Sequence, residues 1–201
     1  MTGVQTCALP ISFLLVSWIQ GDDHCVFVAI TSTLAGIEQY LSAQAPVQQR
    51  VLDVMSPQAQ SGYLTQRLEY GRQPEILRKE MELEYGFVKA GGFLLAGPDP
   101  TGIGGTVAGF GDQRQVELLV EAGFTPLEAI HIATSNGAQF LGELDTIGTI
   151  AVGKRADLVV VRGDPATKIS DIENVEIVFK DGIGYDSAKL INSVRGQVGL
   201  R

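Results

Sequence analysis

A short apolar stretch that runs directly into an aspartate constrains the fold of this chain more than any other feature. Residues 93–96, Phe-Leu-Leu-Ala, have the length and composition of a buried strand. Asp99 follows between Pro98 and Pro100, which fix the local backbone and remove two amide donors. The C-terminal ends of parallel barrel strands collect catalytic side chains, and a carboxylate there suits a metal ligand or a proton acceptor. We therefore predict Asp99 as a catalytic residue and a metal ligand; the alternative is a solvated turn aspartate.

The segment after Asp99 is rich in glycine. Six glycines lie between positions 97 and 111, enough for the backbone to pass close to a ligand or to move as a lid. A phosphate-binding loop is disfavoured, because Val107 stands where a dinucleotide fingerprint requires glycine and the Gly-Lys pair of a P-loop is missing. The alternative is that these glycines only make tight turns. The candidate substrate-loop residues are Thr101, Gly102, Gly104 and Gly105.

The residues before position 93 predict the elements that lead into this site. Residues 25–34 form an apolar, β-branched run, typical of a strand buried on both faces of a parallel sheet. Residues 38–71 contain scattered proline and glycine and predict an irregular segment with short helices. Residues 75–90 have apolar side chains at helical spacing before a Gly-Gly pair. The order strand, loop, helix, strand indicates an α/β fold.

Two helices are predicted after the glycine-rich loop. The first is expected to begin at a capping pair formed by Asp112 and Gln115 and to end at Gly123. The second has a stronger start signal, because Thr125 is followed by proline and then, three residues after the threonine, by glutamate. This helix is expected to run to about Leu141, where a glycine follows.

The chain then changes from helical to extended patterns. Residues 156–161 predict a buried strand, and residues 175–180 and 183–185 predict a hairpin across the Asp-Gly pair at 181–182. These segments indicate a small β lobe after the helical part. The residues after Gly196 are expected to fray.

The stretch 93–102 and the segment 153–160, Gly-Lys-Arg-Ala-Asp-Leu-Val-Val, together resemble the C-terminal half of the amidohydrolase superfamily of metal-dependent hydrolases. The resemblance rests on motif order and covers roughly the last half to two-thirds of the chain. It implies the C-terminal part of a (β/α)8 TIM-like barrel with a small β-sandwich lobe. In that lobe Lys154 and Asp157 are expected to be turn and packing-edge residues.

The resemblance also implies a chemistry. Members of the imidazolonepropionase-like and prolidase-like kind hydrolyse amide, cyclic amide or peptide C–N bonds with water that a divalent metal activates. The resemblance therefore implies a divalent metal, and zinc is the expected ion. The aspartate that ends the last barrel strand both binds the metal and accepts a proton, and Asp99 matches that position. The implied substrate is a small-molecule amide or peptide.

Several family positions have no counterpart in this chain. Pro98 replaces the small hydroxyl residue that usually precedes the aspartate, and no His-x-His pair or bridging lysine or glutamate is found. His24 precedes a strand and His131 lies within a predicted helix, so neither is expected to be a ligand. One carboxylate cannot hold a metal, and the missing positions would lie upstream of Ser12. We therefore expect a C-terminal fragment that is inactive alone; the alternative is a non-catalytic binding or assembly module of barrel origin.

These expectations divide the chain into three parts. Residues 1–12 resemble the translation of a sequencing-library adapter and are expected to be a non-native leader, with the true N-terminus missing. A secretory signal is disfavoured there because the first basic residue is Arg50. Residues 13–142 are expected to form a partial (β/α) barrel, and residues 143–201 the β lobe and C-terminal tail.

Composition excludes several classes of partner. The 201 residues include 23 acidic and 15 basic side chains, for a net charge of -8, without a basic cluster that would bind nucleic acid or an anionic membrane. No apolar run approaches the roughly 20 residues of a membrane helix. Two cysteines give no support to a disulfide framework, and a cytoplasmic location is favoured. A barrel cut partway round exposes sheet edges, which predicts self-association into a homo-oligomer or aggregates.

Overall fold

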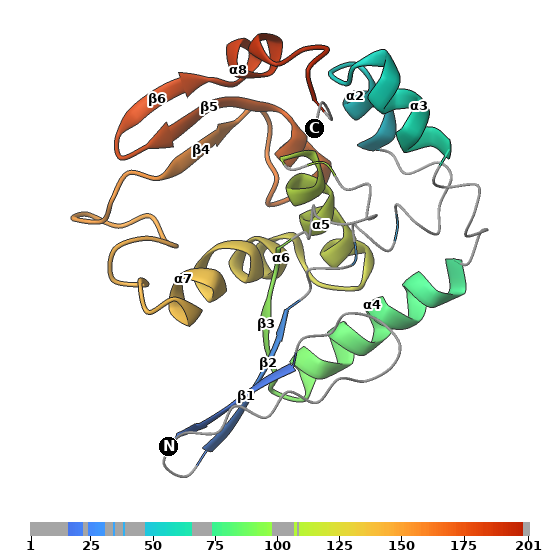
Figure 1. The fold of residues 1–201 in the computed structure, drawn as a ribbon. Helices are drawn as coiled ribbons and strands as arrows, with labels where there is room; N and C mark the ends of the chain where they lie inside the picture. The colour runs from blue at the N-terminus through green and yellow to red at the C-terminus, as the bar shows by residue number, and fades with distance from the viewer. Residues whose placement is uncertain are drawn as a thin grey trace.

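The computed structural model describes residues 16–21, 24–30, 34, 38, 47–65, 74–97, 107 and 109–198. Helices and strands are mixed along this part of the chain and include two three-stranded sheets, one of β1, β2 and β3 and one of β4, β5 and β6 (Figure 1). The strands are β1 Val16–Gly21, β2 His24–Ile30, β3 Phe93–Leu95, β4 Leu158–Val161, β5 Val175–Lys180 and β6 Ile183–Asp186. The helices are α2 Val47–Leu52, α3 Pro57–Thr65, α4 Pro74–Lys89, α5 Phe110–Glu121, α6 Pro126–His131, α7 Gly137–Phe140 and α8 Ser187–Ser193, with η1 Ile132–Asn136 and η2 Ile169–Glu173.

The first sheet contains the predicted parallel pair of strands. Its order is β1-β2-β3, and β2 pairs in parallel with β3, with Ile30 opposite Leu95. The helix α4 lies between these strands in sequence and spans nearly the predicted residues 75–90. A parallel pair needs such a crossover connection. The α/β class is therefore confirmed, whereas a complete barrel stays a prediction.

The strand predicted over residues 25–34 is shorter than expected, and its antiparallel partner was not predicted. The structure ends β2 at Ile30, and Leu34 is already helical. The strand β1 forms an antiparallel pair with β2, with Gly21 opposite His24. The two residues between these strands in the sequence are Asp-Asp, which lacks the glycine of a recognisable hairpin turn. The sequence signal for this hairpin is therefore weak.

The main core forms where β3 meets the helices that follow it. Leu94 is 1% exposed and clusters with apolar side chains from α5 to η1. Burial of each such side chain contributes roughly 1.5 to 3 kcal/mol. From α4, Tyr85 packs edge-on against Phe124, with ring centroids 5.1 Å apart. The buried members are Leu94, Val116, Leu119, Phe124, Ala129 and Ile132.

The start of α5 corrects the predicted capping pair. The helix begins at Phe110, two residues before Asp112, and Gln115 is a buried helical residue rather than a capping partner. The carboxylate of Asp112 accepts a hydrogen bond from the backbone N–H of Gly109 at 2.6 Å. Gly109 has a positive φ of 83° and no side chain to mark the cap, so the residue pattern predicts a later start.

The second predicted capping pair is confirmed. The backbone N–H of Glu128 donates to Thr125 Oγ1 at 3.2 Å, and the N–H of Thr125 donates to Glu128 Oε2 at 2.8 Å. The helical stretch continues from there to Phe140, close to the predicted end at Leu141. Its middle is a π-helical segment over Ile132–Asn136, which was not predicted. Gly142 follows with a φ of 71°.

The second sheet contains the strands predicted after residue 155, but the predicted burial of its first strand is wrong. In β4, Val159 and Val160 are 56% and 40% exposed. The order of the sheet is β4-β5-β6 with antiparallel pairing throughout. Asp181 and Gly182 have φ angles of 50° and 79°, as a tight two-residue hairpin turn requires. The described part of the lobe is one sheet, and a second layer that would complete a sandwich stays a prediction.

The expectation that the chain frays after Gly196 is wrong as far as Val198. The backbone N–H of Gly196 donates to the carbonyl of Val54 at 2.8 Å, and Val198 forms a β-bridge with Met55. The C-terminal end therefore lies beside α2 and α3 (Figure 1). The sequence carries no local signal for this contact, because its partners lie more than 140 residues away.

A buried ion network joins α5 to a residue that follows β2. Arg114 is 6% exposed and contacts Glu38 through two hydrogen bonds, of 2.8 and 2.7 Å. Its third nitrogen donates to Glu117 at 2.9 Å and to Glu121 at 2.7 Å. Glu38 and Glu117 are buried, whereas half of the Glu121 side chain is exposed.

Among the helices that the structure describes, none combines the length and the apolar character that a membrane span requires.

Two substitutions test how much the Arg114 network stabilises the fold. Glu38→Gln removes a buried charge that faces Arg114 and should lower the free energy of unfolding by about 3 kcal/mol. Glu121→Gln removes a carboxylate that also pairs with Arg114 but is half exposed. It should lower the free energy of unfolding by less than about 1 kcal/mol. Urea denaturation of the two variants and the parent chain measures the difference. Equal losses would show that Glu38 is no more important than a surface partner.

Candidate functional site

The candidate site lies where β2 and β3 end. Because the two strands are parallel and Ile30 pairs with Leu95, their C-terminal ends meet at one edge of the sheet. From Leu95 the described chain continues through Ala96 to Gly97. The predicted residues Asp99, Thr101, Gly102, Gly104 and Gly105 lie outside the described residues. Their catalytic, metal-binding and substrate-binding roles therefore stay predictions.

A buried asparagine holds β3 just before this edge. The side-chain nitrogen of Asn136 donates to the backbone carbonyl of Leu94 at 2.7 Å, and Asn136 is 8% exposed. Asn136 is the last residue of the π-helical segment, and such segments occur often at functional sites. Sequence reasoning missed this residue, because neither its partner nor the π geometry has a local signature. The contact fixes the strand from which Asp99 follows.

The Arg114 network lies along the same two connections. Glu38 follows the C-terminal end of β2 by eight residues, and Arg114 belongs to α5, the first described helix after β3. Burial disfavours the charge of Arg114, but the hydrogen bonds that it donates to Glu38 and Glu121 outweigh this effect and hold the arginine pKa above its usual value. The pair therefore ties together the segments that follow two neighbouring strands.

A wide cavity of about 1570 Å³ opens beside the end of β3. It reaches Gly97 and Gly109, which flank the segment 98–108 in the sequence. Its polar lining includes Arg50, whose guanidinium contacts Glu173 at 2.6 Å and Gln113 at 2.9 Å. Arg50 is therefore already paired and is not a free anion-binding group.

The two histidines, neither of which was expected to bind metal, lie on different elements. His24 is the first residue of β2, at the end of the strand opposite to the candidate site. His131 ends α6 and is exposed. Among the described residues, no group of three or more His, Cys, Asp or Glu side chains could hold a metal ion. The described residues therefore do not provide a metal site by themselves.

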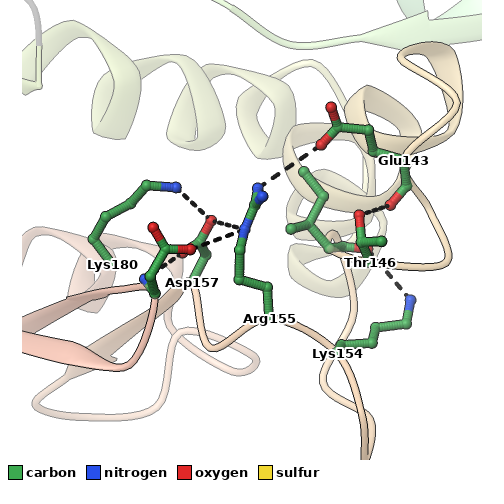
Figure 2. Close-up of polar contacts among 8 residues, drawn as sticks. Glu143, Thr146, Lys154, Arg155, Asp157 and Lys180 are labelled. Atoms are coloured by element: carbon green, nitrogen blue, oxygen red, sulfur yellow. Dashed lines mark hydrogen bonds and ion pairs between the residues drawn. The ribbon is translucent and has the colours of Figure 1, made fainter.

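The segment 153–160, which carries the family resemblance, is organised around Asp157. Figure 2 shows this carboxylate between the side chains of Lys180 and Arg155. Asp157 accepts hydrogen bonds from the backbone N–H of Asp181 at 2.8 Å, from Lys180 at 2.8 Å and from Arg155 at 2.9 Å. These contacts, the Asp181 amide first, lower the pKa of Asp157 to about 2. Asp157 thus fastens the hairpin turn to the start of β4, which agrees with its predicted structural role.

Lys154 and Arg155 connect the same segment to the loop that precedes it. The ammonium of Lys154 donates to the carbonyls of Leu144 and Ile147 and to the hydroxyl of Thr149. Arg155 reaches the carboxylate of Glu143 at 3.8 Å (Figure 2). Through these hydrogen bonds the Lys154 ammonium closes the loop 144–154, as expected of a turn residue.

The loop closed by Lys154 packs on the π-helical segment at Gly148. The hydroxyl of Ser135 donates to the Gly148 carbonyl at 3.1 Å. Gly148 has a φ of 83°, and a Cβ built there overlaps the Cβ of Ala138. Only glycine fits this position without displacing backbone or side chain.

Gly148→Ala should therefore destabilise the chain more than Gly142→Ala. Both glycines have positive φ, of 83° and 71°, so both substitutions carry the backbone cost of the left-handed region. A Cβ added at Gly148 meets neighbouring atoms within 4 Å, whereas one added at Gly142 does not. The resulting overlap should lower the free energy of unfolding of Gly148→Ala by roughly 1 to 3 kcal/mol more. Thermal or urea denaturation of the two variants measures this difference. A loss at Gly148 no larger than that at Gly142 would contradict the close approach of the loop to Ala138.

Comparisons with known proteins confirm the resemblance seen in the sequence. Residues 99–183 match the amidohydrolase family. A protein from Bifidobacterium longum described as a prolidase is similar in structure, with 25% identity and a TM-score of 0.53. A Xaa-Pro dipeptidase with bound methionine has 28% identity and a TM-score of 0.49, and an amidohydrolase from Thermotoga maritima has 29% identity and a TM-score of 0.43. The comparison with curated proteins found no match.

The chain spans only part of these structures. The similarity to the Bifidobacterium longum protein covers 83% of this chain and 38% of that one. For the dipeptidase the shares are 74% and 34%, and for the Thermotoga maritima protein 53% and 26%.

Proposed function

We propose that this chain is the C-terminal part of a metal-dependent amidohydrolase that hydrolyses amide, cyclic amide or peptide C–N bonds. The observation that carries this proposal is the family match, which begins at Asp99 and ends at Ile183, the first residue of β6. The parallel pair β2 and β3, whose C-terminal ends share one edge, supports it by leading the chain toward Asp99. The similarity to the Bifidobacterium longum protein favours a small amide or dipeptide as the substrate.

The division of the chain follows from this proposal. Residues 13–142 supply strands and helices to a (β/α) barrel, and residues 143–201 supply a lobe beside it. In this arrangement the Asn136 and Arg114 contacts position the barrel edge. The Asp157 and Lys154 contacts organise the lobe. The described side chains therefore support the site, and Asp99 carries its chemistry.

The resemblance implies a divalent metal, with zinc as the expected ion. This chain would supply only one of the several ligands that such a metal needs. The described residues hold no set of metal ligands, and of the two histidines in the sequence His24 begins β2 and His131 ends α6. We therefore assign to this chain the single carboxylate of Asp99 and derive no step from the metal. When water attacks the substrate carbonyl, a carboxylate oxygen of Asp99 accepts the proton that the water loses.

A non-catalytic binding or assembly module is the second candidate. The observation that favours it is the lack of a group of metal-ligating side chains among the described residues. The two candidates differ in what a longer protein containing this chain would do. A hydrolase gains metal and activity when the other ligands are supplied, whereas a module does not.

The isolated chain should neither keep metal nor hydrolyse amides. One carboxylate and two histidines on separate elements do not form a ligand set that holds zinc or manganese through desalting. Metal analysis after gel filtration and an assay of Xaa-Pro dipeptides against a metal-free blank measure both properties. One tightly held metal ion per chain would show that His24 or His131 has been misjudged.

Substitution of Asp99 in a longer, active protein tests its catalytic role. Asp99→Asn keeps the shape and one oxygen ligand but removes the proton acceptor, so turnover should fall roughly 10²- to 10⁴-fold while KM changes much less. Gly104→Ala provides the contrast, because stiffening the loop should change kcat and KM together. Steady-state kinetics and metal content of both variants decide between the two effects. A near-normal kcat in Asp99→Asn would rule out Asp99 as the base.

A further inference from the structure

The helix α4 carries two buried carboxyl groups that the proposed function does not use. Glu80 and Glu84 are 7% and 2% exposed. They are four residues apart on one helix, so their side chains are neighbours on the same face. Within the part of the chain that the structure describes, Glu84 Oε2 has no hydrogen-bond partner. A buried carboxylate without a partner is costly, and a neighbouring carboxylate adds repulsion.

The elements around α4 offer Glu84 no compensating cation among the described residues. The strand β3 consists of Phe93–Leu95 and has no titratable side chain. The charged residues of α5 are bonded elsewhere: Asp112 to the backbone of Gly109, and the others to one another and to Glu38. On α4 itself, Lys89 contacts Glu128 at the exposed end of the helix. Glu80 is the charged group whose field acts on Glu84.

We propose that Glu80 and Glu84 form a pH-sensitive latch, in which α4 stays packed on β3 and α5 while Glu84 is protonated and loosens when Glu84 loses its proton. The helix supplies apolar side chains to both neighbouring core clusters, with Met81 against Leu118 and Tyr85 against Phe124. It is also the crossover between the parallel strands β2 and β3. Loosening α4 therefore exposes the core that holds β3. This latch belongs to α4 and holds whether or not the longer protein is a hydrolase.

The direction of the pH effect follows from the burial of Glu84. Burial, with a smaller contribution from the charge of Glu80, raises the pKa of Glu84 from 4.5 to about 8. A group whose pKa is raised by folding stabilises the folded state fully below its unfolded pKa, and this stabilisation is lost as the pH rises through the folded value. The packing of α4 should therefore weaken between about pH 5 and about pH 8 and reach its weakest level above that range.

Hydrogen exchange of the whole chain tests the latch. Exchange of the peptide 74–89, corrected for the intrinsic effect of pH, should rise about 10- to 30-fold from about pH 6.5 to about pH 9. Glu84→Gln keeps the shape and stays neutral, so the rise should shrink to less than about 2-fold. Glu82→Gln removes a charge from an exposed position of the same helix and should behave like the parent chain. Peptides from 175–186 report whether the change is confined to α4.

Three results would overturn the latch. In the first, exchange of 74–89 rises with pH in Glu84→Gln as much as in the parent chain. In the second, Glu82→Gln abolishes the rise as Glu84→Gln does, and in the third, exchange of 175–186 rises as much as that of 74–89. If Glu84→Gln does not fold, the side-chain carboxyl carbons of the ¹³C-glutamate-labelled parent chain are titrated by NMR. One glutamate resonance with a midpoint above about pH 6.5 is then expected. A titration in which every glutamate has its midpoint below that value refutes the proposal.

Discussion

The buried guanidinium of Arg114 is the interaction on which the arrangement around β2 and β3 depends. Removing such a charge from water costs several kcal/mol, and the cost is offset only when good partners surround it. Glu38 accepts two hydrogen bonds from Arg114, although it lies 76 residues away in the sequence. Burial raises the pKa of Glu117 despite its contact with Arg114, so Glu117 holds a proton more readily than an exposed glutamate. The network therefore works chiefly through the Arg114–Glu38 pair, which also fixes where the chain runs after β2.

The lobe is organised by a different balance of the same forces. Asp157 lies at the surface, where ion pairs with Lys180 and Arg155 contribute little because water and salt screen them. Its bond to the backbone N–H of Asp181 is directional and holds the hairpin turn in one position. Lys154 does the same for a loop by donating to backbone carbonyls. In the lobe, charged side chains therefore specify turns, whereas at Arg114 the burial of charge makes any misplacement costly.

How much of this structure the sequence predicts depends on whether the cause of each feature is local. The helix α4, the capping pair of Thr125 with Glu128 and the hairpin at Asp181-Gly182 follow from patterns within a few residues, and all three are confirmed. The helix start at Gly109 was missed because a glycine cap has no side chain to announce it. The docking of Val198 on Met55 was missed because its partner is remote in sequence. Fold class and element order are thus readable, while the contacts that close the fold are not.

The same distinction explains what is known of the candidate site. Asp99 could be proposed because a strand, a carboxylate and a glycine-rich loop are adjacent in the sequence. Asn136 could not, because it acts on Leu94 from 42 residues away through a π-helical turn that no residue pattern marks. A catalytic carboxylate needs its strand held to within a fraction of an ångström, and residues that hold it this way need no chemistry of their own. In this chain the proposed reactive group is therefore visible in the sequence, whereas the groups that position its strand become visible only in the structure.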